Sequence, residues 1–116
     1  MSSRLKVEQM GEVTVVNFLD KRILDEPTIQ VIADQLFAIV DDQKARKMVL
    51  NFANVEYMSS AALGKLINLH KKLVGVQGRM AMCNVIPQIH EVFTITRLDR
   101  IFKIHPDEDA AVKAVT

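Results

Sequence analysis

The sequence is poor in cysteine, glycine and proline, and it lacks a long hydrophobic run. Cys83 is the one cysteine among 116 residues, so no disulfide can form within the chain. With four glycines and three prolines, no flexible linker is visible, which predicts one domain over residues 1–116. The longest apolar run, Leu36 to Val40, is far shorter than the roughly 20 residues of a membrane-spanning helix. Because residues 1–10 also lack the apolar core of a secretion signal, we expect a cytoplasmic protein without membrane insertion.

An excess of one charge is also missing. The chain has 15 Lys and Arg residues against 14 Asp and Glu residues, which gives a formal net charge of +1. Proteins that bind nucleic acids usually gather a basic excess on one face. The composition therefore argues against direct nucleic-acid binding.

No local motif for catalysis, for a cofactor or for a metal is present. Gly64-Lys65 resembles the end of a phosphate-binding loop, but Ser59 stands at the position of its first glycine and Leu66 at that of its Ser or Thr. The three histidines are too far apart in sequence to form a local metal site. The acidic cluster 107–109 lies at a predicted helix start, where carboxylates offset the helix dipole. We expect no enzyme, no cofactor and no metal, and we expect Cys83 to be a small buried side chain.

The apolar periodicity predicts strands that alternate with helices. Residues 5–10 and 12–18 form an expected strand pair that turns near Gly11. A helix then begins at the N-cap Asp25, with Pro27 in its first turn and apolar residues spaced along one face. Further strands are expected at 47–52, 79–85 and 100–104, and further helices at 61–73, 87–96 and 106–115. This order predicts an α/β fold, with a mixed, mostly parallel sheet of about five strands covered by about four helices.

Two details of the predicted helices leave alternatives open. Val31 and Ile39 fall outside the apolar stripe of their helix, so they either touch the margin of the sheet or form an exposed patch. Gly75 and Gly78 follow the helix that begins after the serines, and we expect them to mark its end.

Ser59 and Ser60 lie between the buried strand 47–52 and the helix that follows. A serine in this place commonly caps a helix, and its loss costs about 1 kcal/mol. The residues alone therefore indicate a structural role for this pair.

The wider stretch from Met48 to Leu73 resembles the signature of the STAS domain, which occurs in anti-sigma-factor antagonists and in the cytoplasmic domains of sulfate transporters. That signature has an apolar strand, a short polar loop, an aromatic or apolar pair, and then Asp-Ser-Ser/Thr-Gly-Leu-Gly at the start of a helix. The corresponding segments here are Met48 to Phe52, residues 53–56, Tyr57-Met58 and the closing Leu63-Gly64. Because the N-terminal strands, the first helix and the tail also resemble the family, the likeness covers nearly the whole chain.

The resemblance implies that Ser60 is the phosphorylated serine, with Ser59 as second choice. Ser59 stands where the family usually has Asp, Ala61 at the second Ser/Thr, and Ala62 at the Gly. The expected partner-binding residues surround the serine: Glu56, Tyr57, Met58, Ser59, Ala61 and Lys65. Tyr57 and Met58 could equally belong to the core, and Glu56 and Lys65 could be ordinary surface charges.

The resemblance also implies a mechanism, partner switching. The unphosphorylated protein would bind an anti-sigma factor that is also a serine kinase, phosphorylation would release it, and a serine phosphatase would restore binding. The protein would then be a substrate and a ligand, and not a catalyst. The alternative is a STAS scaffold or a small-ligand sensor in a signalling assembly, without phosphorylation.

Overall fold

A five-stranded sheet forms the centre of the protein. The computed structural model describes residues 3–116, so the first two positions of the domain expected over 1–116 lie outside the described residues. The strands are β1 (Leu5–Met10), β2 (Val13–Phe18), β4 (Lys47–Asn51), β6 (Arg79–Cys83) and β7 (Lys103–His105). They follow one another across the sheet in the order β1-β2-β4-β6-β7. Only β1 and β2 are antiparallel, which confirms the predicted mixed, mostly parallel sheet.

The sheet begins with a tight hairpin. Met10 pairs with Val13, so Gly11 and Glu12 alone form the turn between β1 and β2. Gly11 has a φ of 63°, which glycine adopts at little cost because it has no Cβ. The expected turn near Gly11 is therefore confirmed.

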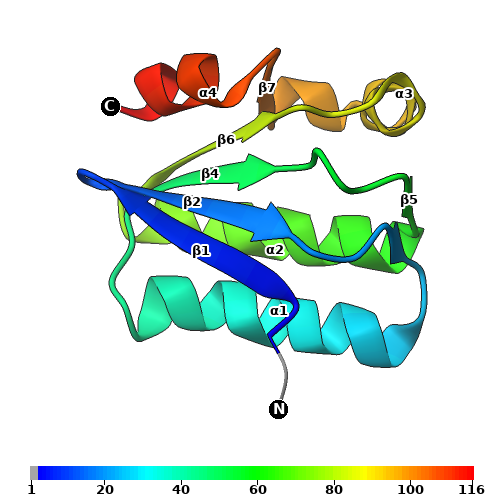
Figure 1. Ribbon diagram of the computed structural model, residues 1–116, viewed down its shortest axis with the longest axis horizontal. Helices are drawn as coiled ribbons and strands as arrows, with labels where there is room; N and C mark the ends of the chain where they lie inside the picture. The colour runs from blue at the N-terminus through cyan, green and yellow to red at the C-terminus, as the bar shows by residue number, and fades with distance from the viewer. Residues whose placement is uncertain (1–2) are drawn as a thin grey trace.

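Helices cover both faces of the sheet (Figure 1). The helices α1 (Glu26–Asp41) and α2 (Ser60–Gly75) lie side by side on one face, and α4 (Glu108–Val115) packs on the other. A third helix, α3 (Pro87–Ile95), is followed by the short 3-10 helix η1 (Leu98–Arg100). Within residues 3–116, no helix combines the length and the apolar character that crossing a membrane requires.

The alternation of side chains along β2 divides the core into two layers. Val16 and Phe18 point into the larger apolar cluster, which includes the buried faces of α1 and α2. Val13 and Val15 point to the other face, into a smaller cluster that includes Ala111 of α4. Because β2 is buried on both faces, its sequence is an almost continuous apolar run.

The first helix follows its sequence signals. The Asp25 side chain accepts a hydrogen bond from the Thr28 N–H at 3.2 Å. Hydrogen bonding to the Thr28 side chain, and to a lesser extent to the Thr28 N–H, lowers the pKa of the Asp25 carboxyl below its usual value. Of the two residues outside the apolar stripe, Ile39 is buried and Val31 is half-buried. The two residues therefore do not form an exposed patch.

The end of the chain differs from its prediction. The last strand was expected at 100–104, but Leu98–Arg100 forms η1 and β7 occupies Lys103–His105. Leu98 and Phe102 are buried, and the Phe102 N–H donates to the Leu98 carbonyl at 2.8 Å. A helical turn thus provides hydrogen-bond partners for the backbone of this segment before the strand begins. The spacing of the apolar residues alone does not predict this turn.

A second, two-stranded sheet was not predicted. It pairs β3 (Arg22–Ile23) with β5 (Tyr57–Met58) in parallel. Each strand has two residues, which is too short for any alternating pattern. This small sheet lies directly before α2, at the end of the molecule where the serines lie.

Candidate functional site

Ser59 is the N-cap of α2. Its backbone is extended, with a φ of −85° and a ψ of 167°, and its Oγ accepts a hydrogen bond from the Ala62 N–H at 3.3 Å. The Ser59 carbonyl accepts from the Leu63 N–H at 3.1 Å, which closes the first helical turn. The expected capping role of the serine pair is therefore confirmed and falls on Ser59, which fills the place that Asp fills in many helix caps.

We expect Ser59→Ala to lower the free energy of unfolding by about 1 kcal/mol, because the Ala62 N–H loses its acceptor. Ser59→Asp should retain the stability, since a carboxylate caps as well and favours the positive end of the helix. Urea denaturation measures both. Ser60→Ala is the matched control and should change stability by less than about 0.5 kcal/mol. Equal losses in Ser59→Ala and Ser60→Ala would contradict the assignment of the cap.

Ser60 is the first residue of α2, and it is exposed. Among residues 3–116 its hydroxyl makes no hydrogen bond to another protein group, whereas the Ser59 hydroxyl is engaged in the cap. The two adjacent serines thus differ in environment: one is part of the helix start, and the other points its side chain to solvent.

The small sheet fixes the approach to the serines. The Ser59 N–H donates to the Ile23 carbonyl at 3.1 Å, and the N–H groups of Glu56 and Tyr57 both donate to the Lys21 carbonyl, at 2.8 and 3.1 Å. These bonds attach the segment before α2 to β3. The start of α2 therefore has a defined position relative to the start of α1, which follows β3.

Two asparagines hold the loop between β4 and β5. The Asn51 Oδ1 accepts hydrogen bonds from the Ala53 N–H at 2.9 Å and from the Asn84 Nδ2 at 3.2 Å. The Asn54 Nδ2 donates to the Phe18 carbonyl at 3.2 Å. This loop is thus tied to β2 and to Asn84, the residue directly after β6, and it leads to Tyr57 and the serines at one end of the sheet.

The expected partner-binding residues divide into two groups. Glu56, Tyr57 and Ala61 are exposed, and Tyr57 retains 54% of its accessible surface. Met58 and Lys65 are half-buried and lie beside an apolar void of about 10 Å³ below the helix start. A volume of this size has room for about one water molecule.

Sequence reasoning missed two residues next to the serines. The Arg22 guanidinium lies over the Tyr57 ring, 5.0 Å from its centroid, a favourable cation–π geometry. Leu24 is exposed and directly follows Ile23, whose carbonyl accepts from the Ser59 N–H. Their position depends on a two-residue strand pair, so no local sequence signal marks them.

The residues around Cys83 and the other possible ligands do not form a metal site in the described part of the chain. Within residues 3–116, no three His, Cys, Asp or Glu side chains are grouped so that they could hold a metal ion. Cys83 is buried, as expected, and burial together with Glu108 and Asp107 raises the pKa of its thiol to about 11. The thiol is therefore protonated at neutral pH and is a poor nucleophile.

Comparison with known proteins decides the family. The family described as "STAS domain" matches residues 4–111. The chain belongs to the STAS domain family. An "Anti-sigma F factor antagonist" from Paenibacillus polymyxa is 28% identical over 116 residues, which cover 100% of this chain and 95% of that protein.

Solved STAS structures have the same fold. An anti-sigma-factor antagonist (STAS) domain protein from Planctomyces limnophilus superposes with a TM-score of 0.86 at 25% identity, covering 100% of both chains. The Bacillus cell fate determinant SpoIIAA in its phosphorylated form superposes with a TM-score of 0.73 at 19% identity, covering 97% of this chain and 99% of that one. The second likeness concerns the fold alone.

Proposed function

We propose that this protein is an anti-sigma-factor antagonist that acts by partner switching in the cytoplasm. Unphosphorylated, it binds an anti-sigma factor that is also a serine kinase, and phosphorylation of Ser60 releases it. A serine phosphatase reverses the modification. The observation that carries the proposal is the position of Ser60, an exposed hydroxyl at the first residue of α2.

The helix start suits a phosphate at Ser60. The first N–H groups of a helix have no partner within the helix, and the helix dipole is positive at this end. The free N–H groups and the dipole both favour a phosphate, which adds a charge of about −1.5 to −2 at neutral pH. Phosphorylation of Ser59 would instead disturb the hydroxyl that caps Ala62. Ser60 is therefore the better acceptor, and its modification leaves the fold intact.

The proposed docking surface surrounds Ser60. It comprises the six expected contact residues and the two neighbours found above: Arg22, Leu24, Glu56, Tyr57, Met58, Ser59, Ala61 and Lys65. The exposed Tyr57 ring and the exposed Leu24 side chain offer apolar area on this surface. A phosphate dianion within this apolar area would lose its hydrating water when the partner binds. The free-energy cost of this desolvation weakens the complex and releases the partner.

We expect the cognate kinase with ATP to place one phosphate on Ser60. Phosphopeptide mapping by mass spectrometry locates it, and a pull-down before and after the reaction reports binding to the anti-sigma factor. Ser60→Ala is the control and should stay bound in the presence of ATP. Phosphate on Ser59 alone, or on neither serine, would refute the assignment.

A scaffold or small-ligand sensor is the second candidate. It is favoured by Ser59 and Ala62, which replace the usual Asp and Gly of the family signature. A hollow of about 500 Å³ lined by residues such as Glu12, Lys44 and Lys47 lies away from the serines, and its size is in the range of ligand sites. A native mass spectrum of the protein purified from its source would reveal a retained ligand or a stable larger assembly, and either would favour this candidate.

A further inference from the structure

The strand β1 is an open edge of the sheet. It pairs with β2 on one side only and ends the strand order. It lies across the front of the molecule in Figure 1, with no helix drawn over it. An edge strand offers unpaired backbone groups to another strand, so the groups of β1 that face outward decide what it can bind.

The hairpin register identifies those groups. The Leu19 N–H donates to the Arg4 carbonyl at 3.1 Å, so the backbone of Arg4 faces β2. Because the direction alternates along a strand, the even-numbered residues of β1 face β2, and Leu5, Val7 and Gln9 face the open edge.

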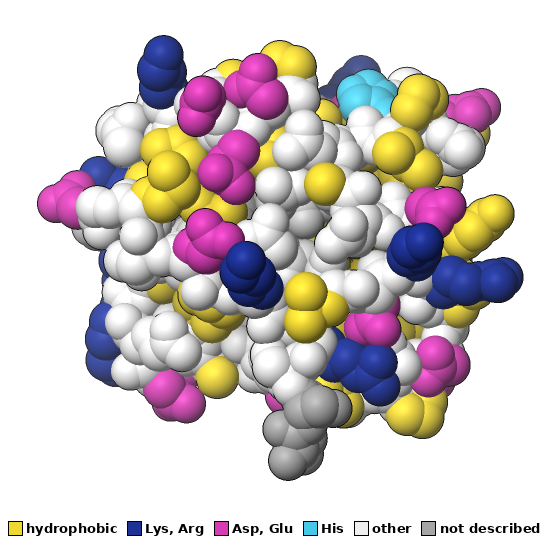
Figure 2. Space-filling model, viewed as in Figure 1, with side chains coloured by type: hydrophobic (Ala, Val, Ile, Leu, Met, Phe, Trp, Pro, Cys, Tyr) yellow, Lys and Arg dark blue, Asp and Glu magenta, His cyan; other side chains and the backbone are white. Residues whose placement is uncertain are grey.

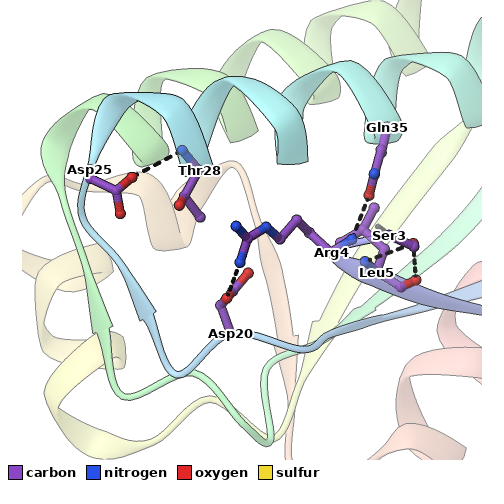
Figure 3. A network of polar contacts seen from close by, with 7 residues as sticks. All are labelled: Ser3, Arg4, Leu5, Asp20, Asp25, Thr28 and Gln35. Atoms are coloured by element: carbon purple, nitrogen blue, oxygen red, sulfur yellow. Dashed lines mark hydrogen bonds and ion pairs between the residues drawn. The ribbon is translucent and has the colours of Figure 1, made fainter. Parts of the chain in front are cut away.

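At one end of this edge, the outward-facing backbone groups already have hydrogen-bond partners. Figure 3 shows the Ser3 hydroxyl beside Leu5, where it donates to the Leu5 carbonyl at 2.6 Å and accepts from the Leu5 N–H at 3.2 Å. The Arg4 N–H donates to the Gln35 Oε1 at 3.0 Å, which ties the start of β1 to α1. The backbone available for a new strand is therefore centred on Val7 and Gln9.

The side chains of β1 form a charge pattern that is complementary to itself. Lys6 and Glu8 lie on the same face of the strand, with the Lys6 Nζ 3.6 Å from the Glu8 Oε1, and 67% and 46% of their side chains are exposed. Val7, between them, is 42% exposed on the opposite face. On the face of the molecule shown in Figure 2, acidic and basic side chains are interspersed.

We propose that two copies of this protein dimerise by antiparallel pairing of their β1 strands, with the two-fold axis at Val7. In this register each Lys6 lies opposite Glu8 of the second copy, and the two Val7 residues exchange backbone hydrogen bonds. The result is one sheet that continues through both molecules. A two-fold contact uses the same residues twice, so both opposite-charge pairs form together.

The free backbone of Val7 and Gln9 allows registers centred on Val7, on Glu8 and on Gln9. Charge decides between the first two, and the cross-linking test below separates the first from the third. Pairing Val7 with Gln9 of the second copy would place the axis at Glu8 and set the two Glu8 carboxylates opposite each other. Directly opposed like charges destabilise a strand pair, and opposite charges stabilise it. The register centred on Val7 is therefore favoured over the one centred on Glu8.

The surface beside β1 is hollowed. A hollow of about 250 Å³ lies between β1 and α1 and is lined in part by Leu5, Val7, Ala38 and Ile39. In the extended sheet, Val7 of the second copy would lie on this face and cover part of the hollow. Pairing through one edge buries less than the roughly 1,600 Å² of a standard interface, so the dimer is weak and depends on concentration.

Exchanging the charges of Lys6 and Glu8 tests the strand pairing. The test is independent of the proposed function, because these variants leave Ser60 unchanged. Sedimentation velocity over a concentration series should show a monomer–dimer equilibrium for the natural protein. Lys6→Glu opposes like charges twice and should weaken dimerisation by about tenfold or more. The double variant Lys6→Glu/Glu8→Lys restores both pairs and should dimerise like the natural protein.

Lys71→Glu is the matched control, because it makes the same charge change at an exposed position of α2 and should leave dimerisation unchanged. Circular dichroism checks that each variant is folded. A natural protein that remains monomeric up to about 1 mM would overturn the proposal. A dimer that Lys6→Glu weakens no more than Lys71→Glu does would overturn it as well.

Cross-linking tests the register itself. The Cα atoms of the two Val7 residues would lie about 5.5 Å apart, within reach of a disulfide. The Cα atoms of the two Gln9 residues would lie about 14 Å apart, because each Gln9 lies opposite a residue four positions away from Gln9 of the second copy.

The experiment uses diamide as the oxidant, which takes two electrons and two protons from a thiol pair. Val7→Cys should form a covalent dimer and Gln9→Cys should not. The natural Cys83 is buried and does not compete. Equal cross-linking of the two variants would contradict the register centred on Val7.

Discussion

Ser60→Asp is expected to weaken binding to the cognate anti-sigma factor by about a hundredfold, whereas Ser60→Ala should retain nearly full affinity. The carboxylate brings a charge into the proposed docking surface, which includes the exposed apolar side chains of Tyr57 and Leu24. Burying an unpaired charge in an interface costs roughly 2–5 kcal/mol, which corresponds to about 30-fold or more in affinity. Isothermal titration calorimetry with the purified anti-sigma factor measures the dissociation constant of each variant.

Ser60→Asn is the matched control, because Asn has the shape of Asp without its charge. If charge causes the release, Asn should weaken binding much less than Asp does. Asp at the first position of a helix is favourable for the helix dipole, so Ser60→Asp should unfold at the same urea concentration as the natural protein. Equal losses with Asn and Asp would assign the effect to size, and the electrostatic mechanism would then be wrong.

The sequence predicted the strands and helices that have strong periodicity. The helix α1 has an N-cap, a proline in its first turn and an apolar stripe, and it begins where these signals indicate. The continuous apolar runs of β4 and β6 predicted buried parallel strands. In each of these elements the local preference and the tertiary contacts agree, and this agreement makes them readable from one sequence.

The elements that escaped prediction depend on distant contacts. The strands β3 and β5 exist because Arg22 pairs with Tyr57 and Ile23 with Met58, and neither segment has a pattern of its own. Likewise, η1 replaces the start of the expected last strand. A single sequence holds no information on such pairings, so Arg22 and Leu24 could be placed beside the serines only with the structure.

For the serine pair, the sequence suggested both roles but could not divide them between the two residues. Capping depends on the extended backbone of Ser59 and on the bond from the Ala62 N–H to its Oγ. A shift of one residue would exchange the roles. The register of β3 with β5 excludes that shift, because the Ser59 N–H is held by the Ile23 carbonyl. A tertiary contact thus selects Ser60 as the free hydroxyl.

The two glycines near the end of α2, Gly75 and Gly78, show a similar division of roles. Both were expected to mark the end of the helix, and α2 does end at Gly75. The residue with the left-handed backbone is nevertheless Gln77, with a φ of 62°. Gly78 has a different role: a Cβ built on it would lie 2.7 Å from the Arg46 carbonyl oxygen and 2.9 Å from the Leu73 Cδ2. Here glycine is required for close packing, and not for its φ.

We therefore expect Gly78→Ala to lower the free energy of unfolding by about 2–3 kcal/mol, because the added methyl overpacks a rigid site. The Arg46 carbonyl cannot easily move, since it accepts from the Arg79 N–H at 2.7 Å where β4 meets β6. Leu73 is buried, and its carbonyl accepts from the Gly78 N–H at 2.6 Å. Gly75→Ala is the matched control: a Cβ there meets nothing within 4 Å, and alanine in place of a helical glycine stabilises by up to about 1 kcal/mol. Urea denaturation should thus show changes in the free energy of unfolding of opposite sign for the two variants. A Gly78→Ala variant as stable as the natural protein would contradict this expectation, because the junction between α2 and β6 would then adjust to the methyl group.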